Sequence, residues 1–185
     1  MFIQTEATPN PASMKFLPGR TVTDDGVVDF TDAERAAEAS PLAQRLFAVN
    51  GVSGVYLGRD FITVTKGDVS PWQELKPAVL GAIMEHFMSG EPAVVAGMVT
   101  EDPTGADEDD ELVKQIRELI DTRVRPAVAQ DGGDIVFQGF ERGVVFLHMR
   151  GACSGCPSSV VTLKNGIENL LRYYVPEVTE VRAVD

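Results

Sequence analysis

An acidic segment divides this 185-residue chain into two parts. Between Glu101 and Glu111 it holds seven carboxylates and no basic residue, together with Pro103, Gly105 and almost nothing apolar. A segment of this composition cannot bury a hydrophobic core, so we expect a solvated, flexible linker. The sequence therefore predicts two small α+β domains, at residues 1–99 and 112–185, joined by an acidic linker at residues 100–111.

The charge of the chain restricts its partners. The net charge is −12, and seven of these charges lie in the acidic segment, whereas residues 112–185 are neutral overall. Binding to nucleic acid or to an anionic membrane requires a basic face, so we expect neither partner. No apolar stretch approaches the ~20 residues that span a bilayer. The first residues show neither a secretory signal nor an Arg-rich transit peptide, which together with only two cysteines indicates a reducing compartment.

Strand and helix patterns alternate in residues 1–99, but no catalytic constellation is visible there. The expected strands are Phe2–Glu6 and Met14–Leu17, followed by a hairpin around Gly58-Arg59-Asp60. One helix is expected from Ser40-Pro41, and another from Ser70-Pro71 that Pro77 should kink or delay. His86 lies late on the second helix, and a lone histidine there is expected to fill a core or surface position rather than bind a ligand. We expect this domain to contact clients or partners.

Residues 112–185 predict a small three-stranded sheet with helices on one face. A first amphipathic helix starts near Leu112, and Pro126 is expected to kink or end it. Strands are expected at Ile135–Phe140, Val144–Met149 and Val178–Val184. Pro157 opens a second helix, whose expected apolar face consists of Val160, Leu163, Ile167, Leu170 and Tyr174.

The only two cysteines, Cys153 and Cys156, form a C-x-x-C pair between an expected strand and the helix that Pro157 opens. Small residues around them let the loop turn sharply. The N–H groups and partial positive charge of a helix N-terminus favour the thiolate, which is both a metal ligand and a nucleophile. The two-residue gap lets both sulfurs reach one metal ion or one edge of a cluster.

Four interpretations of this pair remain open. An iron–sulfur cluster takes four thiolates, which two chains can supply across a two-fold axis. A thioredoxin-like dithiol has the same strand–loop–helix order, although the preceding strands resemble a meander and no tryptophan precedes Cys153. A zinc site needs four ligands, and only His148 is near, so it would also need a second chain. The fourth interpretation is a structural pair without a ligand.

Longer motifs around the cysteines resemble a known family. Asp131–Ile135, Gly151–Ser159 and Thr162–Glu168 resemble the NifU C-terminal (Nfu) domain. Thr8–Pro11 and Lys15–Gly19 resemble the N-terminal domain of the Nfu proteins of α-proteobacteria and mitochondria. Together the two resemblances cover the chain except for the acidic linker.

The resemblance implies an iron–sulfur cluster scaffold or carrier rather than an enzyme. Family members bind a [4Fe-4S] cluster between two protomers, through ligands that correspond to Cys153 and Cys156. They receive the cluster from an upstream donor and pass it to apo-proteins such as lipoyl synthase or aconitase. The expected compartment is the bacterial cytoplasm, or the mitochondrial matrix for a processed eukaryotic form.

Four charged residues near the cysteine motif are further candidates. Four thiolates on a [4Fe-4S]²⁺ core leave a net charge of −2, which Arg150 and Lys164 are positioned in sequence to stabilise. Ordinary surface charge is the alternative for both, and we favour it for Lys164. Asp131 and Asp134 flank two glycines and are expected to form a turn and to cap the start of a strand.

Overall fold

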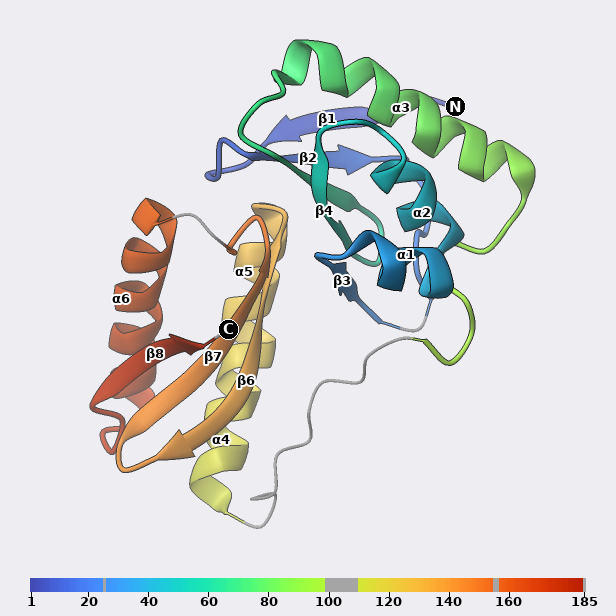
Figure 1. The fold of residues 1–185 in the computed structure, drawn as a ribbon. Helices are drawn as coiled ribbons and strands as arrows, with labels where there is room; N and C mark the ends of the chain where they lie inside the picture. Colours follow the sequence, from blue (N-terminus) through green and yellow to red (C-terminus); the bar gives the residue numbers. More distant parts are fainter. Residues whose placement is uncertain (25, 99–109, 155–156, 185) are drawn as a thin grey trace. The chain divides into compact units, whose positions relative to one another are not determined.

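The computed structural model describes residues 1–24, 26–98, 110–154 and 157–184, with only the backbone at residues 157–159. The chain divides into two compact units, Met1–Thr100 and Glu101–Asp185. Each unit has its own helices, sheet and hydrophobic core, so both are α+β as predicted (Figure 1). Most of the predicted linker falls outside the described residues, and the boundaries at 99 and 112 stay predictions. Among the described residues, no helix is both long and apolar enough to cross a membrane.

The described part of the N-terminal unit has an antiparallel sheet with the strand order β1-β2-β5-β4-β3. The strands and helices lie, in chain order, at β1 Gln4–Ala7, β2 Ser13–Leu17, β3 Val28–Phe30, α1 Ala33–Ala39, α2 Pro41–Phe47, β4 Val52–Leu57, β5 Ile62–Lys66 and α3 Trp72–Ser89.

One face of this sheet packs against the three helices. The predicted hairpin is confirmed, since β4 and β5 pair with Leu57 opposite Ile62 across the turn. Alternate residues of the strands lie in the same buried cluster as apolar residues of α1, α2 and α3, because successive side chains of a strand point to opposite faces. The members from β4, β5 and the helices include Val55, Leu57, Ile62, Val64, Ala36, Leu46, Val79 and Ile83.

Two elements of the N-terminal unit, β3 and α1, were not predicted from the sequence. Strand β3 is only three residues long, which is too short to show an alternating pattern. Helix α1 begins after Asp32, whose carboxylate accepts a hydrogen bond of 2.8 Å from the backbone of Glu34. Its buried residues are Ala36 and Ala39, and these small side chains give a weak hydrophobic period.

The two predicted helix starts of this unit are present. Ser40 caps α2 by accepting a hydrogen bond of 2.9 Å from the backbone of Ala43, and Pro41 is the first helical residue. Helix α3 begins at Trp72, so Pro77 lies inside the helix and does not delay its start. Gly90, with φ of 75°, ends this helix in the left-handed conformation.

The described part of the C-terminal unit has a three-stranded sheet in the order β6-β7-β8, as expected. Strands β6 and β7 form an antiparallel hairpin through Arg142 and Gly143, whereas β8 runs parallel to β7. The parallel pair needs a crossover, which α6 provides. The elements lie at α4 Glu111–Leu119, a π-helical turn Ile120–Val124, α5 Arg125–Gln130, β6 Gly133–Glu141, β7 Val144–Gly151, α6 Pro157–Tyr174 and β8 Glu180–Val184.

Pro126 does not end the first helix of this unit, contrary to one of the two outcomes expected from sequence. Helical structure continues from Glu111 to Gln130, with Pro126 in the first turn of α5. Just before it, the backbone N–H of Arg125 bonds to the carbonyl of Ile120, which is the wider π-helical spacing. A proline ring clashes with the carbonyl four residues back in a regular helix, and a wide turn at this point relieves that clash.

The apolar face of α6 differs at one residue from the expected face. Ile167 is buried, and Val160, Leu163 and Leu170 pack against the core, as predicted. Tyr174 is instead exposed, and Leu171, which follows Ile167 by one turn, lies fully in the core. Tyr174 is the last residue of α6, and its ring lies 5.1 Å from the guanidinium carbon of Arg123.

Candidate functional site

Cys153 lies in a tight turn that begins where β7 ends. Gly151, the last residue of β7, has φ of 62° and turns the chain away from the sheet. The backbone N–H of Cys153 donates to the carbonyl of Arg150 at 3.3 Å, and that of Ser154 donates to Gly151 at 3.1 Å. A third bond, from Ala152 to the carbonyl of Gly132 at 3.2 Å, ties this turn to the Asp131–Gly133 turn. The two sequence motifs are therefore hydrogen-bonded neighbours.

The second cysteine lies outside the described residues. Residues 155 and 156 have no described position, and α6 begins directly after them at Pro157. The predicted strand before the pair and the predicted helix after it are both present. The joint role of Cys153 and Cys156 as ligands stays a prediction.

Burial sets the chemistry of the Cys153 thiol. The residue is 6% exposed and packs in the core of the C-terminal unit. Burial, followed by the charges of Asp131 and Asp134, raises the pKa of this thiol to about 12. This direction is opposite to the thiolate-favouring environment expected from the helix N-terminus, because loss of hydration disfavours the charged form. The raised pKa favours the neutral thiol of Cys153 at neutral pH.

Asp134 is a buried ion-pair partner rather than only a capping residue. It is 4% exposed, and its two carboxylate oxygens accept hydrogen bonds from Nε and Nη2 of Arg125 at 2.9 and 3.0 Å. Arg125 also lies 3.3 Å from the carboxylate of Asp121, one turn earlier. This fork-like pairing links the start of β6 to α5 and holds a negative charge near Cys153. The sequence alone does not reveal this pair, because the turn at Asp131 and Gly132 is what brings β6 back beside α5.

The two basic candidates have different surroundings. Arg150 is 8% exposed near the end of β7, three residues before Cys153. Lys164 is half-buried on α6, and its ammonium lies 4.0 Å from Glu180 of β8. The Glu180 partner fits the surface-charge interpretation of Lys164.

The structure bears on the zinc and redox alternatives for the cysteine pair. The Nδ1 atom of His148 lies 3.2 Å from the carbonyl of Val184. His148 also alternates with Leu147 and Met149, which face the core that contains Cys153, so its side chain is on the other face of the sheet. Among the described residues no group of three or more His, Cys, Asp or Glu side chains could hold a metal ion. For the redox alternative, the strands before the loop form an antiparallel hairpin, as the meander interpretation expected.

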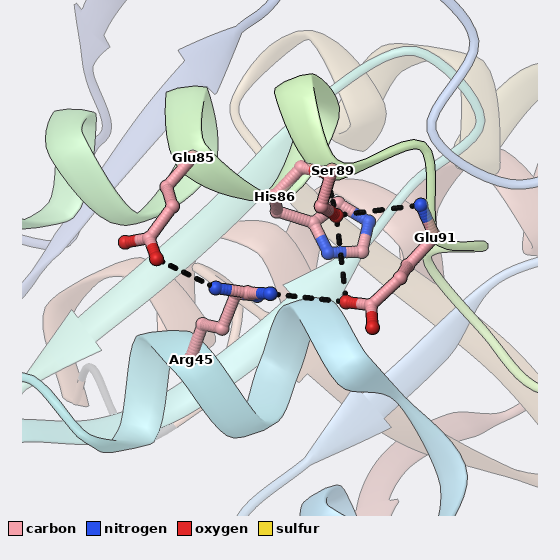
Figure 2. Close-up of polar contacts among 5 residues, drawn as sticks. All are labelled: Arg45, Glu85, His86, Ser89 and Glu91. Atoms are coloured by element: carbon pink, nitrogen blue, oxygen red, sulfur yellow. Dashed lines mark hydrogen bonds and ion pairs between the residues drawn. The ribbon is translucent and has the colours of Figure 1, made fainter.

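His86 is a fully buried residue at the end of α3, which fits the expected filler role. Figure 2 shows it beside an ion-pair network in which Arg45 contacts Glu85 and Glu91, each at 3.0 Å. Within the described structure neither ring nitrogen of His86 makes a hydrogen bond of standard geometry, although the backbone of Glu91 is near enough to the ring to raise its pKa slightly. Burial, and then the charge of Arg45, lower the pKa of the imidazole, and the nearby Glu91 only partly offsets them.

Comparisons with known proteins agree with this two-unit architecture. A family model described as "Scaffold protein Nfu/NifU N terminal" matches residues 3–90, and one described as "NifU-like domain" matches residues 116–182. A human protein named "NFU1 iron-sulfur cluster scaffold homolog, mitochondrial" is 50% identical over 185 residues, which cover 100% of this chain and 72% of the human protein. A protein of the same name from Drosophila sechellia is 52% identical, and this chain spans 65% of its length.

Solved structures of related proteins match smaller parts of the chain. A NifU-like protein from Saccharomyces cerevisiae has a TM-score of 0.47 at 25% identity, covering 52% of this chain and 86% of its own. A Staphylococcus aureus protein has a TM-score of 0.38 at 25% identity, covering 44% of this chain and 98% of its own.

The fold and the cysteine loop define a two-domain α+β protein with a C-x-x-C pair on the crossover of its second sheet. With both domain matches and the human relative, the chain belongs to the Nfu family of NifU-related proteins.

Proposed function

We propose that this chain is an iron–sulfur cluster scaffold or carrier without enzymatic activity of its own. Two protomers bind one [4Fe-4S] cluster as cargo, through Cys153 and Cys156 of each protomer. The observation that carries the proposal is the cysteine turn between β7 and α6, in a domain that matches the NifU-like model. The printed names of the relatives, iron–sulfur cluster scaffold homologs, support the same class of function.

The stoichiometry follows from the number of thiolates. Iron–sulfur clusters are held by four cysteines, and the chain has two. A two-fold axis between identical chains supplies the other two and makes cluster binding depend on dimerisation. Thiolates of an apo-protein client can then replace the pair of one protomer, which releases the cargo. An upstream donor supplies the cluster, and the clients are apo iron–sulfur proteins of the lipoyl synthase or aconitase type.

The surroundings of Cys153 are compatible with a cluster that the protein both holds and releases. The thiol of Cys153 is neutral and sheltered before loading, and it must lose its proton to bind iron. Helix α6 begins at Pro157, the residue after the pair, so free N–H groups and partial positive charge at its first turn would offset part of the charge of a bound cluster. Mitochondrial names among the relatives support the matrix as the compartment, with the bacterial cytoplasm as the alternative.

The proposal is tested by anaerobic reconstitution of the full chain with iron and sulfide, followed by iron analysis and mass measurement on one sample. We expect about four iron atoms per dimer and the absorbance of a cubane cluster. Cys153→Ser and Cys156→Ser should each abolish iron uptake and keep the fold, because serine removes a soft thiolate ligand. The exposed residue Val161 of α6 provides a control, and Val161→Ser should bind iron like the parent. Four iron atoms per monomer, or none, would contradict the bridging model.

The same samples separate the alternatives. Metal analysis of anaerobically purified protein tests the zinc interpretation, because four thiolates from two protomers can also bind zinc: bound zinc together with no uptake of iron and sulfide would favour it. A monomer that reduces a test disulfide through these two cysteines, without binding a cluster, would favour the dithiol interpretation.

A further inference from the structure

Gly133 has a backbone conformation that residues other than glycine can adopt. It is the first residue of β6 and pairs with Gly151 of β7. The preceding residue, Gly132, has φ of 78°, in the left-handed region that favours glycine. Gly133 is not among the described residues with positive φ, so its backbone would accept an L side chain. Space rather than conformation must therefore explain a glycine at this position.

The atoms around Gly133 show what occupies that space. A Cβ atom at this position would lie 2.2 Å from Sγ of Cys153, 3.0 Å from its backbone nitrogen and 3.1 Å from its Cβ. The first of these distances is far inside van der Waals contact. The sulfur of Cys153 thus lies in the volume that any other side chain at residue 133 would fill.

We infer that Gly133 is a positioning residue for Cys153, because its missing side chain makes the space that holds the cysteine sulfur against the domain core. The hydrogen bond from Ala152 to Gly132 keeps the two turns in register around this contact. A methyl group at residue 133 turns the sulfur out of its place toward solvent. The importance of this contact for cluster binding rests on the proposed function, whereas the position of the sulfur over Gly133 can be tested without a cluster.

Gly139 provides a matched control on the same strand. It also lies in β6 with φ outside the positive range, and a Cβ there would meet nothing within 4 Å. Both Gly133→Ala and Gly139→Ala add one methyl group and the same change in chain entropy. The methyl group meets Cys153 only at residue 133, whereas residue 139 lies beside the irregularity in the β6–β7 register and has open space around it.

The first test measures the rate of alkylation of Cys153 by iodoacetamide, in full-length Cys156→Ser protein at one fixed pH. We expect Gly133→Ala to raise this rate at least ~10-fold, because an exposed cysteine reacts without a local opening of the fold. Gly139→Ala should leave the rate within about twofold of the parent. Circular dichroism checks that each variant is folded. An unchanged rate in folded Gly133→Ala would overturn the inference.

The second test remains informative if Gly133→Ala folds poorly. Adding Cys153→Ala to Gly133→Ala removes Sγ, so it should recover part of the lost stability, whereas Cys153→Ala combined with Gly139→Ala should show no such coupling. Absence of recovery would overturn the inference. Iron uptake is measured separately, in Gly133→Ala and Gly139→Ala proteins that keep both cysteines. It should fall at least ~2-fold in Gly133→Ala and not in Gly139→Ala. If the parent binds no iron, the proposed function fails while the alkylation and stability tests still decide the role of Gly133.

Discussion

His86 is a buried base whose ring nitrogens make no hydrogen bond of standard geometry in the described structure, and its burial affects the stability of the N-terminal unit. Its ring packs edge-on against Phe87, with ring centroids 5.4 Å apart. Three charged residues affect its titration: Arg45 and Arg20 disfavour the imidazolium, and Glu91 favours it. Because burial has the largest effect, the folded N-terminal unit favours the neutral imidazole.

The free energy of unfolding of this unit should therefore depend on pH through His86. The folded-state pKa lies below the unfolded value, so the unfolded chain binds the proton first as pH falls. Stability is full above the unfolded pKa of about 6.5 and decreases as pH falls below it. Urea unfolding, followed by the fluorescence of the only tryptophan, Trp72, should give a lower stability at pH 5.5 than at pH 7.5.

His86→Phe removes the titrating group and keeps an aromatic ring of similar size. We expect it to flatten the pH dependence and to raise stability at pH 7.5 by about 1 kcal/mol, since two buried ring nitrogens without a well-formed hydrogen bond are lost. The exposed neighbour Glu85 supplies a control through Glu85→Gln. An equal pH slope in His86→Phe and in the parent would show that other groups dominate.

Asp134 gives a second prediction for a single side chain. Asp134→Asn should lower the stability of the C-terminal unit by about 2 kcal/mol, because the guanidinium of Arg125 then loses its best-buried charged partner. Arg125 remains partly exposed and keeps Asp121, which limits the loss. Thermal unfolding followed by circular dichroism measures the effect. Glu141→Gln, at an exposed carboxylate of the same strand, should change stability by less than about 0.5 kcal/mol.

The hydroxyl of Ser40 makes two hydrogen bonds at the start of helix α2. Its hydroxyl accepts from the backbone of Ala43 and donates to the carbonyl of Ala93, which follows α3. Ser40→Ala should cost about 2 kcal/mol, the upper end of the range for an N-cap, because Ala93 is left with a buried unpaired oxygen. Urea unfolding measures the loss through Trp72 fluorescence. Ser53→Ala, at an exposed hydroxyl of β4, should be almost neutral, and equal effects would refute the double role of Ser40.

Elements that are marked by turn residues, prolines or a clear hydrophobic period could be predicted from the sequence, and the others could not. The β4–β5 hairpin and the starts of α2 and α6 were predicted because turn residues and N-terminal prolines mark them directly. Helix α1 was missed because alanines form its buried face. The exposure of Tyr174 was also missed, since a helical period cannot show where the helix ends and the core stops.

The two-unit organisation leads to a prediction about cluster transfer. Removal of residues 1–100 leaves the cysteine unit with its own core and sheet, so cluster assembly should be preserved. If the N-terminal unit binds clients, transfer to an apo-protein should slow at least ~10-fold, because the local client concentration falls. The measurement is the rate of client activation by reconstituted full-length and shortened protein. Equal rates would refute the client-binding role of the N-terminal unit.

Local chemistry in the sequence was sufficient for the two-unit α+β organisation and for the family, and it singled out the cysteine pair. Composition excludes a core in the acidic segment, and turn, cap and C-x-x-C signals act over a few residues. Only tertiary structure placed Cys153 in a buried position with a raised pKa, seated it over Gly133 and paired Asp134 with Arg125. Burial, space and ion pairing depend on residues far apart in the chain, whose positions are decided only when the strands and helices pack.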